Sequence, residues 1–148
     1  MPAINFYHLT QSSLEDVLPA LLVKARQTGS SIIIKAPNET RLEMLNNFLW
    51  VFDPNSFLPH GAAKDGNAAA QPIYLTTGDE KPNGAELLVL IDGVEGEISD
   101  YTKCLDIFDG MNEESLTAAR ARWQRYKQAG YEVKYFQQQE GQGWKQAA

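Results

Sequence analysis

Basic side chains crowd near the C-terminus of this acidic chain, and they carry its clearest capacity for chemistry. The formal net charge is −6. Five of the thirteen lysines and arginines nevertheless fall in one short stretch: Arg120, Arg122, Arg125, Lys127 and Lys134. Because a guanidinium group can pair with a carboxylate through two hydrogen bonds, this cluster suits an acidic partner. The negative charge of the whole chain disfavours a nucleic-acid backbone as partner.

Most of these basic residues lie on a helix predicted over residues 112–129. Its apolar residues recur at helical spacing and form one stripe: Leu116, Ala119, Trp123 and Tyr126. Arg120, Gln124 and Lys127 follow the same spacing, and the two cations stand at the edge of that stripe, where charged heads reach water. With the aromatic strand predicted over 131–137, this rim could receive an acidic peptide with an apolar end group. A solvated helix face is the alternative.

A second candidate surface is the segment 49–60. It gathers aromatic residues around two prolines: Trp50, Phe52, Pro54, Phe57 and Pro59. Aromatic side chains in a proline-stiffened loop can be a lid over the core or an anchor in an interface. The sequence leaves both interpretations open.

The motifs of nucleotide-binding enzymes are missing. The first two strand–helix turns, residues 10–13 and 36–38, contain no glycine that would let a pyrophosphate approach backbone amides. Asp92 follows an apolar strand as in phosphate-loop ATPases, but the chain has no G-x-x-x-x-G-K-S/T loop, so we interpret it as a turn residue.

The other catalytic patterns fail as well. Cys104 stands among apolar residues and is interpreted as a buried, inert thiol. His8 is interpreted as a core histidine and His60 as a turn residue, because neither has metal-ligand partners at suitable spacing. We therefore expect no catalytic residue, no metal and no cofactor. A nucleotide-binding or hydrolysing α/β enzyme remains an alternative. So does a direct single-stranded DNA binder, although Trp123 and Tyr126 are expected to face inward.

Strands and helices are predicted to alternate along the chain. Strands are expected over 5–9, 31–36, 73–76, 87–91, 104–108 and 131–137. Asp16 is the predicted N-cap of the first helix, which places Pro19 in its first turn, and Asn38 is the predicted N-cap of the second. Residues 61–71 are expected to be a mobile loop and 141–148 a frayed tail.

This order predicts a single-domain α/β fold over residues 1–148. The sheet should be mostly parallel and doubly wound, Rossmann-like, with helices on both faces. The apolar runs are too short to cross a bilayer, the single cysteine suits a reducing compartment, and no export signal is apparent. We therefore expect a cytoplasmic protein.

Three segments carry a resemblance to a known family. They are the opening Asn5-Phe6-Tyr7, the segment 49–60 with its Ser56-Phe57-Leu58-Pro59-His60, and residues 119–131, which read ARARWQRYKQAGY. The chain resembles the chi subunits of bacterial DNA polymerase III holoenzyme, which are non-catalytic clamp-loader accessory proteins. The resemblance implies a bridge from the psi subunit of the clamp loader to the acidic C-terminal tail of single-stranded DNA-binding protein, with DNA contacted only indirectly and no membrane.

The same resemblance assigns roles to residues. Arg120 matches the basic residue that engages the terminal carboxylate of the tail. Gln124 stands where some relatives carry a lysine, so Lys127 is expected to compensate for it. Val133 and Tyr135 match positions that line the tail pocket. All five should surround a positively edged hollow that is open to solvent.

The psi subunit is implied to bind elsewhere. Phe57 matches the aromatic residue that relatives direct toward psi, with Trp50 and Pro59 beside it. The tail surface and the psi surface are therefore expected to be separate.

Overall fold

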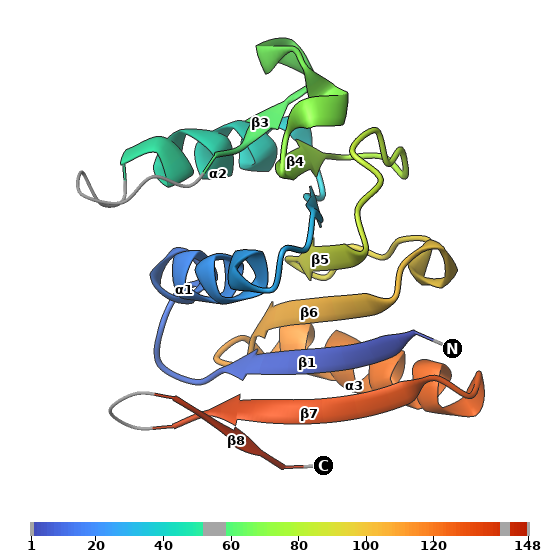
Figure 1. Cartoon of the computed structure of the whole chain (residues 1–148). Helices are drawn as coiled ribbons and strands as arrows, with labels where there is room; N and C mark the ends of the chain where they lie inside the picture. Colours follow the sequence, from blue (N-terminus) through green and yellow to red (C-terminus); the bar gives the residue numbers. More distant parts are fainter. Residues whose placement is uncertain (1, 52–58, 140–142, 148) are drawn as a thin grey trace.

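The computed structural model describes residues 2–51, 59–139 and 143–147 and shows an α/β fold built on one sheet. The eight strands are ordered β3-β4-β2-β5-β6-β1-β7-β8, and only the β7–β8 pair is antiparallel. The strands are β1 (Ala3–Leu9), β2 (Ile32–Lys35), β3 (Gly61–Ala62), β4 (Ile73–Thr76), β5 (Leu87–Ile91), β6 (Lys103–Asp109), β7 (Glu132–Gln138) and β8 (Trp144–Gln146). The helices are α1 (Leu14–Gln27), α2 (Glu39–Val51) and α3 (Glu113–Gln128) (Figure 1).

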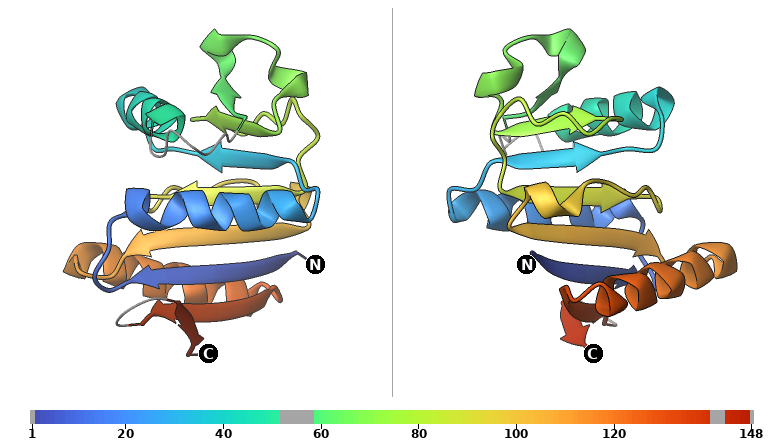
Figure 2. Two further views of the ribbon diagram at one scale, coloured as in Figure 1. Left: turned by 60° about the vertical axis from the view of Figure 1, so that its left-hand side comes forward. Right: turned by 90° about the vertical axis from the view of Figure 1, so that its right-hand side faces the viewer.

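The helices are divided between the two faces of the sheet (Figures 1 and 2). α1 and α2 pack on one face through buried leucines, and α3 packs on the other. The predicted α/β class and mostly parallel sheet are confirmed. Three helices are few for eight strands, however, so the doubly wound, Rossmann-like description is not established.

The central strands are mostly apolar on both faces because helices or loops cover both faces of the sheet. Every residue of β2, β4 and β5 is buried, which is typical of parallel strands inside an α/β sheet. The strands predicted over 73–76 and 87–91 match β4 and β5. The predicted strand over 104–108 lies within β6.

The start of α1 differs from the prediction. Ser13, not Asp16, is the N-cap, and the Asp16 carboxylate accepts a hydrogen bond of 3.2 Å from the Ser13 N–H. Pro19 therefore lies inside the helix and is buried there. The sequence misled because Asp is favoured both at the N-cap and three residues later, where it accepts the N-cap N–H. At the second helix the prediction is confirmed, since Asn38 Oδ1 accepts from the Arg41 N–H at 2.8 Å.

Two segments predicted to be irregular contain regular structure. Residues 61–71 hold β3 and the short 3-10 helices Ala63–Asp65 and Ala68–Ala70. In the segment predicted as a frayed tail, Trp144–Gln146 form β8 and pair with β7. The indole of Trp144 packs edge-on against the Tyr7 ring, with 5.0 Å between centroids. The pairing with β7 and this ring contact together hold the strand on the sheet.

The turn between β1 and α1 is closed by a side chain from β7. The N–H groups of Thr10, Gln11 and Ser12 all donate to the Gln138 side-chain oxygen, at 3.1, 3.1 and 3.2 Å. The Gln138 amide nitrogen donates to the Ser12 hydroxyl at 2.8 Å. In nucleotide-binding sheets the amides of this turn face a phosphate. Here a glutamine of the same chain takes that place.

Candidate functional site

The last helix is positioned by its cap and its apolar stripe. Asn112 Oδ1 accepts from the Ser115 N–H at 3.0 Å and starts α3. Ala119 and Tyr126 are buried against the sheet, and Leu116 and Trp123 pack partly buried beside them. The predicted inward stripe is therefore confirmed.

A buried ion pair fixes α3 to β6. The Arg122 guanidinium donates from Nε to Asp106 Oδ2 at 2.8 Å and from Nη2 to Asp106 Oδ1 at 3.0 Å. The two side chains are only 3% and 1% exposed. Because a buried carboxylate needs such a partner, this pair sets the position of the helix on the sheet. Arg122 thus contributes no charge to the exposed surface.

The three residues predicted for the helix rim lie together and are exposed. Arg120, Gln124 and Lys127 follow one another along α3, and all three are exposed. The Lys127 ammonium sits 5.3 Å from the centre of the Trp123 ring, a cation–π distance. Arg125, on the same helix, is paired with Glu95 at 2.9 Å. Among the described residues, Arg120 makes no ion pair and no side-chain hydrogen bond.

Tyr135 brings β7 to this rim. Its hydroxyl lies 2.7 Å from His8 Nδ1, and its ring packs edge-on against Trp123 with 5.5 Å between centroids. Burial raises the pKa of Tyr135, and the nearby positive charge of Arg120 opposes that rise. Val133 is partly buried two residues earlier on the same face of β7. The structure therefore places the predicted tail residues on one continuous surface of α3 and β7.

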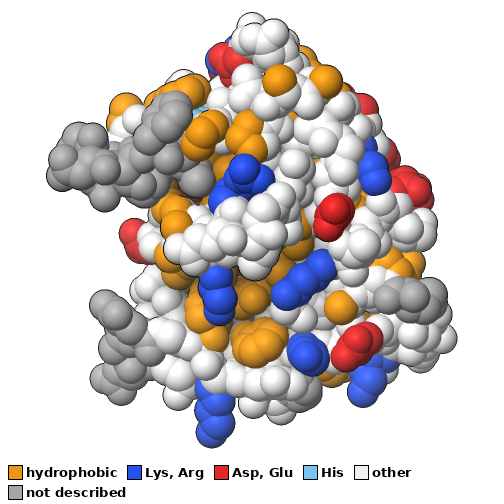
Figure 3. Space-filling view, in the orientation of Figure 1, with side chains coloured by type: hydrophobic (Ala, Val, Ile, Leu, Met, Phe, Trp, Pro, Cys, Tyr) orange, Lys and Arg blue, Asp and Glu red, His pale blue; other side chains and the backbone are white. Residues whose placement is uncertain are grey.

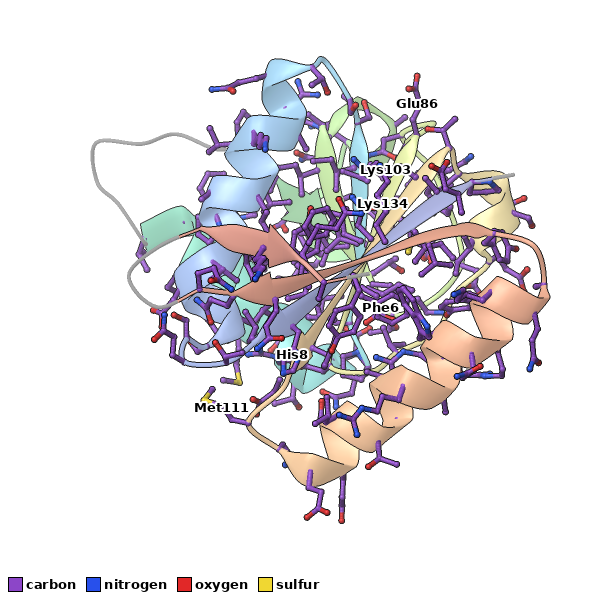
Figure 4. All side chains as sticks on the ribbon, turned by 90° about the horizontal axis from the view of Figure 1, so that it is seen from below. Phe6, His8, Glu86, Lys103, Met111 and Lys134 are labelled. Atoms are coloured by element: carbon purple, nitrogen blue, oxygen red, sulfur yellow. The ribbon has the colours of Figure 1, made fainter. Side chains whose placement is uncertain are left out.

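His8 is a member of this surface that the sequence did not assign to it. Figure 4 shows Phe6 and His8 on the side of the sheet that faces α3. Burial lowers the pKa of His8, and the positive charge of Arg120 lowers it further. Gly110 packs so closely on the imidazole that a Cβ there would lie 1.8 Å from His8 Cδ2. The alternation of β1 could have indicated this, because His8 shares a face with Ile4 and Phe6.

The positively edged hollow predicted beside Arg120 is not one of the best-formed cavities of the described residues. Five of the best-formed hollows in the described part of the molecule have volumes of about 250 to 670 Å³, and none of these five has Arg120 or Tyr135 in its wall. The support for the site comes from its exposed cations and partly buried rings.

The second predicted surface is described only in part. Trp50 is 50% exposed at the end of α2, and its ring centroid lies 4.2 Å from that of His60. Pro59 is exposed, and Phe57 lies outside the described residues. His60, interpreted from the sequence as a turn residue, is buried, with Nε2 3.0 Å from the Asn46 carbonyl oxygen. The structure thus joins Trp50 to the segment that carries Pro59.

The residues considered for catalysis are accounted for by structural contacts. Cys104 is fully buried, and burial raises the pKa of its thiol. Asp92 sits in the left-handed turn after β5 and accepts a 2.6 Å hydrogen bond from Arg41. Within the described ranges no cluster of three His, Cys, Asp or Glu residues could hold a metal ion. None of the helices in those ranges is both long and apolar enough to traverse a bilayer.

Comparison with known proteins places the chain in a family. The model of the family described as DNA polymerase III chi subunit, HolC, matches residues 1–134. A probable DNA polymerase III subunit chi of Rickettsia prowazekii is 32% identical over 91 residues, which are 62% of this chain and 55% of that protein. The chain therefore aligns with only about half the length of that relative.

Two further relatives match over most of their length. The DNA polymerase III subunit chi of Haemophilus influenzae is 26% identical over 84% of this chain and 87% of its own. That of Pseudomonas aeruginosa is 25% identical over 88% of this chain and 93% of its own. With nine-tenths of its sequence matched by the family model, the chain belongs to the DNA polymerase III chi subunit family and is a replication protein.

Proposed function

We propose that this chain is a non-catalytic adaptor of DNA replication. The α3–β7 surface binds the acidic C-terminal tail of single-stranded DNA-binding protein, and the surface at the end of α2 binds the psi subunit of the clamp loader. The chain then ties the polymerase machinery to coated single strands and contacts DNA only indirectly. The proposal is supported by membership of the chi family and by the chemistry of the α3–β7 surface.

The assignment of the tail site rests on a difference in ion pairing among the three arginines of α3. Arg122 forms the buried ion pair with Asp106, and Arg125 forms an exposed ion pair with Glu95. Arg120 is exposed and has no such partner among the described residues. A guanidinium held at the rim of an aromatic cluster is suited to a terminal carboxylate.

The neighbouring side chains suit the rest of an acidic tail. Lys127 adds a second positive charge about two helical turns further along α3. Gln124, between the two cations, can donate hydrogen bonds without adding charge. Trp123, Tyr135 and Val133 offer partly buried apolar surface for the terminal side chain. Because the cations are exposed, the electrostatic part of binding should weaken as salt is raised.

A calorimetric titration with the tail peptide tests this site. Arg120→Ala should weaken binding by roughly 10- to 100-fold, since a charge-assisted hydrogen bond is worth about 1.5–3 kcal/mol. Arg125→Ala is the matched control, because it removes an arginine from the same helix, and should leave affinity within about twofold. A peptide whose C-terminus is amidated should lose most of its affinity for the wild type. Equal affinities of wild type and Arg120→Ala would refute the assignment.

The psi surface needs a separate experiment. Trp50→Ala and Phe57→Ala should each lower the amount of psi that co-purifies with the chain, because large aromatic anchors dominate interfaces. Both variants should bind the tail peptide as the wild type does. Loss of both activities with a lowered melting temperature would indicate misfolding, and undiminished psi binding by both variants would rule the surface out.

A further inference from the structure

The opposite face of the same sheet carries a second surface rich in unpaired cations. Side chains alternate along β7, so Val133 and Tyr135 face α3 while Lys134 and Phe136 face the other way. On that other side α1 lies over β5 and β6 and leaves β7 and β8 uncovered (Figures 1 and 2). This open area has no role in the adaptor function proposed above.

A cavity lies between the C-terminal half of α1 and the sheet. Its volume is about 250 Å³, and its apolar wall consists of Tyr7, Leu21, Ala25, Leu87 and Leu105. A cavity of about 150 Å³ is enough to bind benzene. This one therefore has room for one bulky apolar side chain.

Three lysines surround the cavity mouth and the adjoining strand. Lys24 and Lys103 line the cavity, and Lys134 stands on β7 across β1 from it. All three are exposed, and none makes an ion pair with a described residue, whereas Lys35 and Lys64 do. Figure 3 shows blue cations around an orange apolar strip below α1, and Figure 4 shows Lys103 and Lys134 together, away from α3. We name Lys24, Lys103, Lys134 and the cavity the lysine groove.

The aromatic residues beside the groove are engaged with one another. The rings of Tyr7 and Phe136 are stacked, with 5.4 Å between centroids and 15° between planes. Trp144 meets the Tyr7 ring at 82°. Because these faces are already covered, they are poor platforms for nucleic-acid bases.

We propose that the lysine groove binds an acidic peptide segment of a partner protein that carries one bulky apolar side chain. The apolar side chain enters the cavity, and acidic residues on either side of it pair with Lys24, Lys103 and Lys134. Ammonium groups act as separate point charges, so they suit several side-chain carboxylates spread along a segment. The rims of the α3–β7 surface and of the lysine groove lie on opposite faces of β7, so both can be occupied together.

The probe is a short peptide blocked at both ends, acetyl-Glu-Asp-Phe-Asp-Glu-amide. It has no terminal carboxylate and therefore lacks the group assigned to Arg120. In a two-dimensional amide NMR titration of the full chain, it should shift the signals of Tyr7, Lys103 and Leu105 saturably. Replacing its Phe by Ser should weaken binding about tenfold or more, because the aromatic ring is then no longer transferred from water into the cavity.

Charge reversal supplies the matched variants. The double substitution Lys103→Glu, Lys134→Glu should weaken peptide binding about tenfold or more, since it replaces two attractive charge pairs by two repulsive ones. Lys145→Glu is the control, because its side chain is exposed on the other face of the sheet, and it should change affinity less than about twofold. Both variants alter exposed residues, and their NMR spectra report whether they fold.

Four results would overturn the proposal. The first is the absence of shifts at millimolar peptide, and the second is shifts confined to the α3–β7 surface. The third is binding of oligothymidylate to the groove without binding of the peptide, which would assign it to nucleic acid. The fourth is shifts at the groove that grow with protein concentration alone, which would assign it to a second copy of this chain. Arg120→Ala should leave the blocked peptide unaffected, so the adaptor proposal can fail without this one.

Discussion

Removal of the Arg122 guanidinium should markedly lower the free energy of unfolding, because it breaks the buried ion pair between α3 and β6. Arg122→Met keeps an unbranched side chain but leaves the Asp106 carboxylate, 1% exposed, without its two hydrogen bonds. Breaking one side of a buried pair costs about 3–5 kcal/mol, because an uncompensated charge stays in the interior. For a chain of this size each kcal/mol corresponds to about 2–4 °C. The melting temperature should therefore fall by roughly 6–20 °C.

The measurement is urea and thermal unfolding followed by circular dichroism. Arg125→Met is the control, since Arg125 and Glu95 are 55% and 51% exposed, and should cost at most about 1 kcal/mol. The double variant Asp106→Leu, Arg122→Met should recover to within about 1 kcal/mol of the wild type, because the orphan charge is gone. A single variant that melts within about 2 °C of the wild type would refute the reasoning.

The pH dependence of Arg122→Met gives an independent check. Burial already raises the pKa of Asp106, and the hydrogen bonds from Arg122 oppose that rise. Without Arg122 the folded-state pKa rises further above the unfolded value, so the folded state binds the proton more tightly. The unfolding free energy is then highest below the unfolded pKa and falls as pH rises through the folded one. The deficit of the variant should thus be larger near about pH 8 than near about pH 5.

Three further changes test other parts of the structure. Burial lowers the pKa of His8 from its ordinary value of 6.5. The stability advantage of the wild type over His8→Gln, measured by urea unfolding, should therefore shrink as pH falls through about 6.5. An advantage that is independent of pH would contradict this prediction. Gly110→Ala should cost about 1–3 kcal/mol, because its Cβ would lie 2.7 Å from the Leu9 carbonyl oxygen, and Gly96→Ala, whose Cβ would be no closer than 3.4 Å to any neighbour, should cost less. Gln138→Ala frees three N–H groups at residues 10–12, so phosphate should raise its melting temperature more than that of the wild type; equal shifts would argue against an anion-binding turn.

The spacing of apolar residues predicted helices and strands correctly where the pattern is compatible with only one type of secondary structure. The unbroken apolar run of β5 and the four-residue apolar stripe of α3 were identified correctly, because burial on both faces or on one face leaves a direct mark on the sequence. β8 was missed in part because one of its contacts, between Trp144 and Tyr7, joins residues more than a hundred positions apart. A three-residue strand has too few positions to show an alternation.

Charge was harder to read than hydrophobicity. The sequence grouped five basic residues, but it could not distinguish the buried Arg122 from the exposed Arg120 two positions earlier. The missing information was the position of Asp106, an acidic residue inside the apolar strand β6 that requires a cation from the helix above it. An acid in the middle of an apolar strand is the signal that could have shown which arginine turns inward.

Gln138, which closes the turn between β1 and α1, also affects which ligands can bind at this end of the sheet. In open parallel sheets small ligands enter at the carboxyl ends of the strands. Here the N–H groups of residues 10–12 at that end donate to the side chain of Gln138 on β7 and are not available to a phosphate. The same hydrogen bonds connect the N-terminal and C-terminal parts of the chain. A small anionic ligand is thereby excluded from this turn, and the strand that supplies the glutamine, β7, carries residues of the two proposed surfaces on its opposite faces.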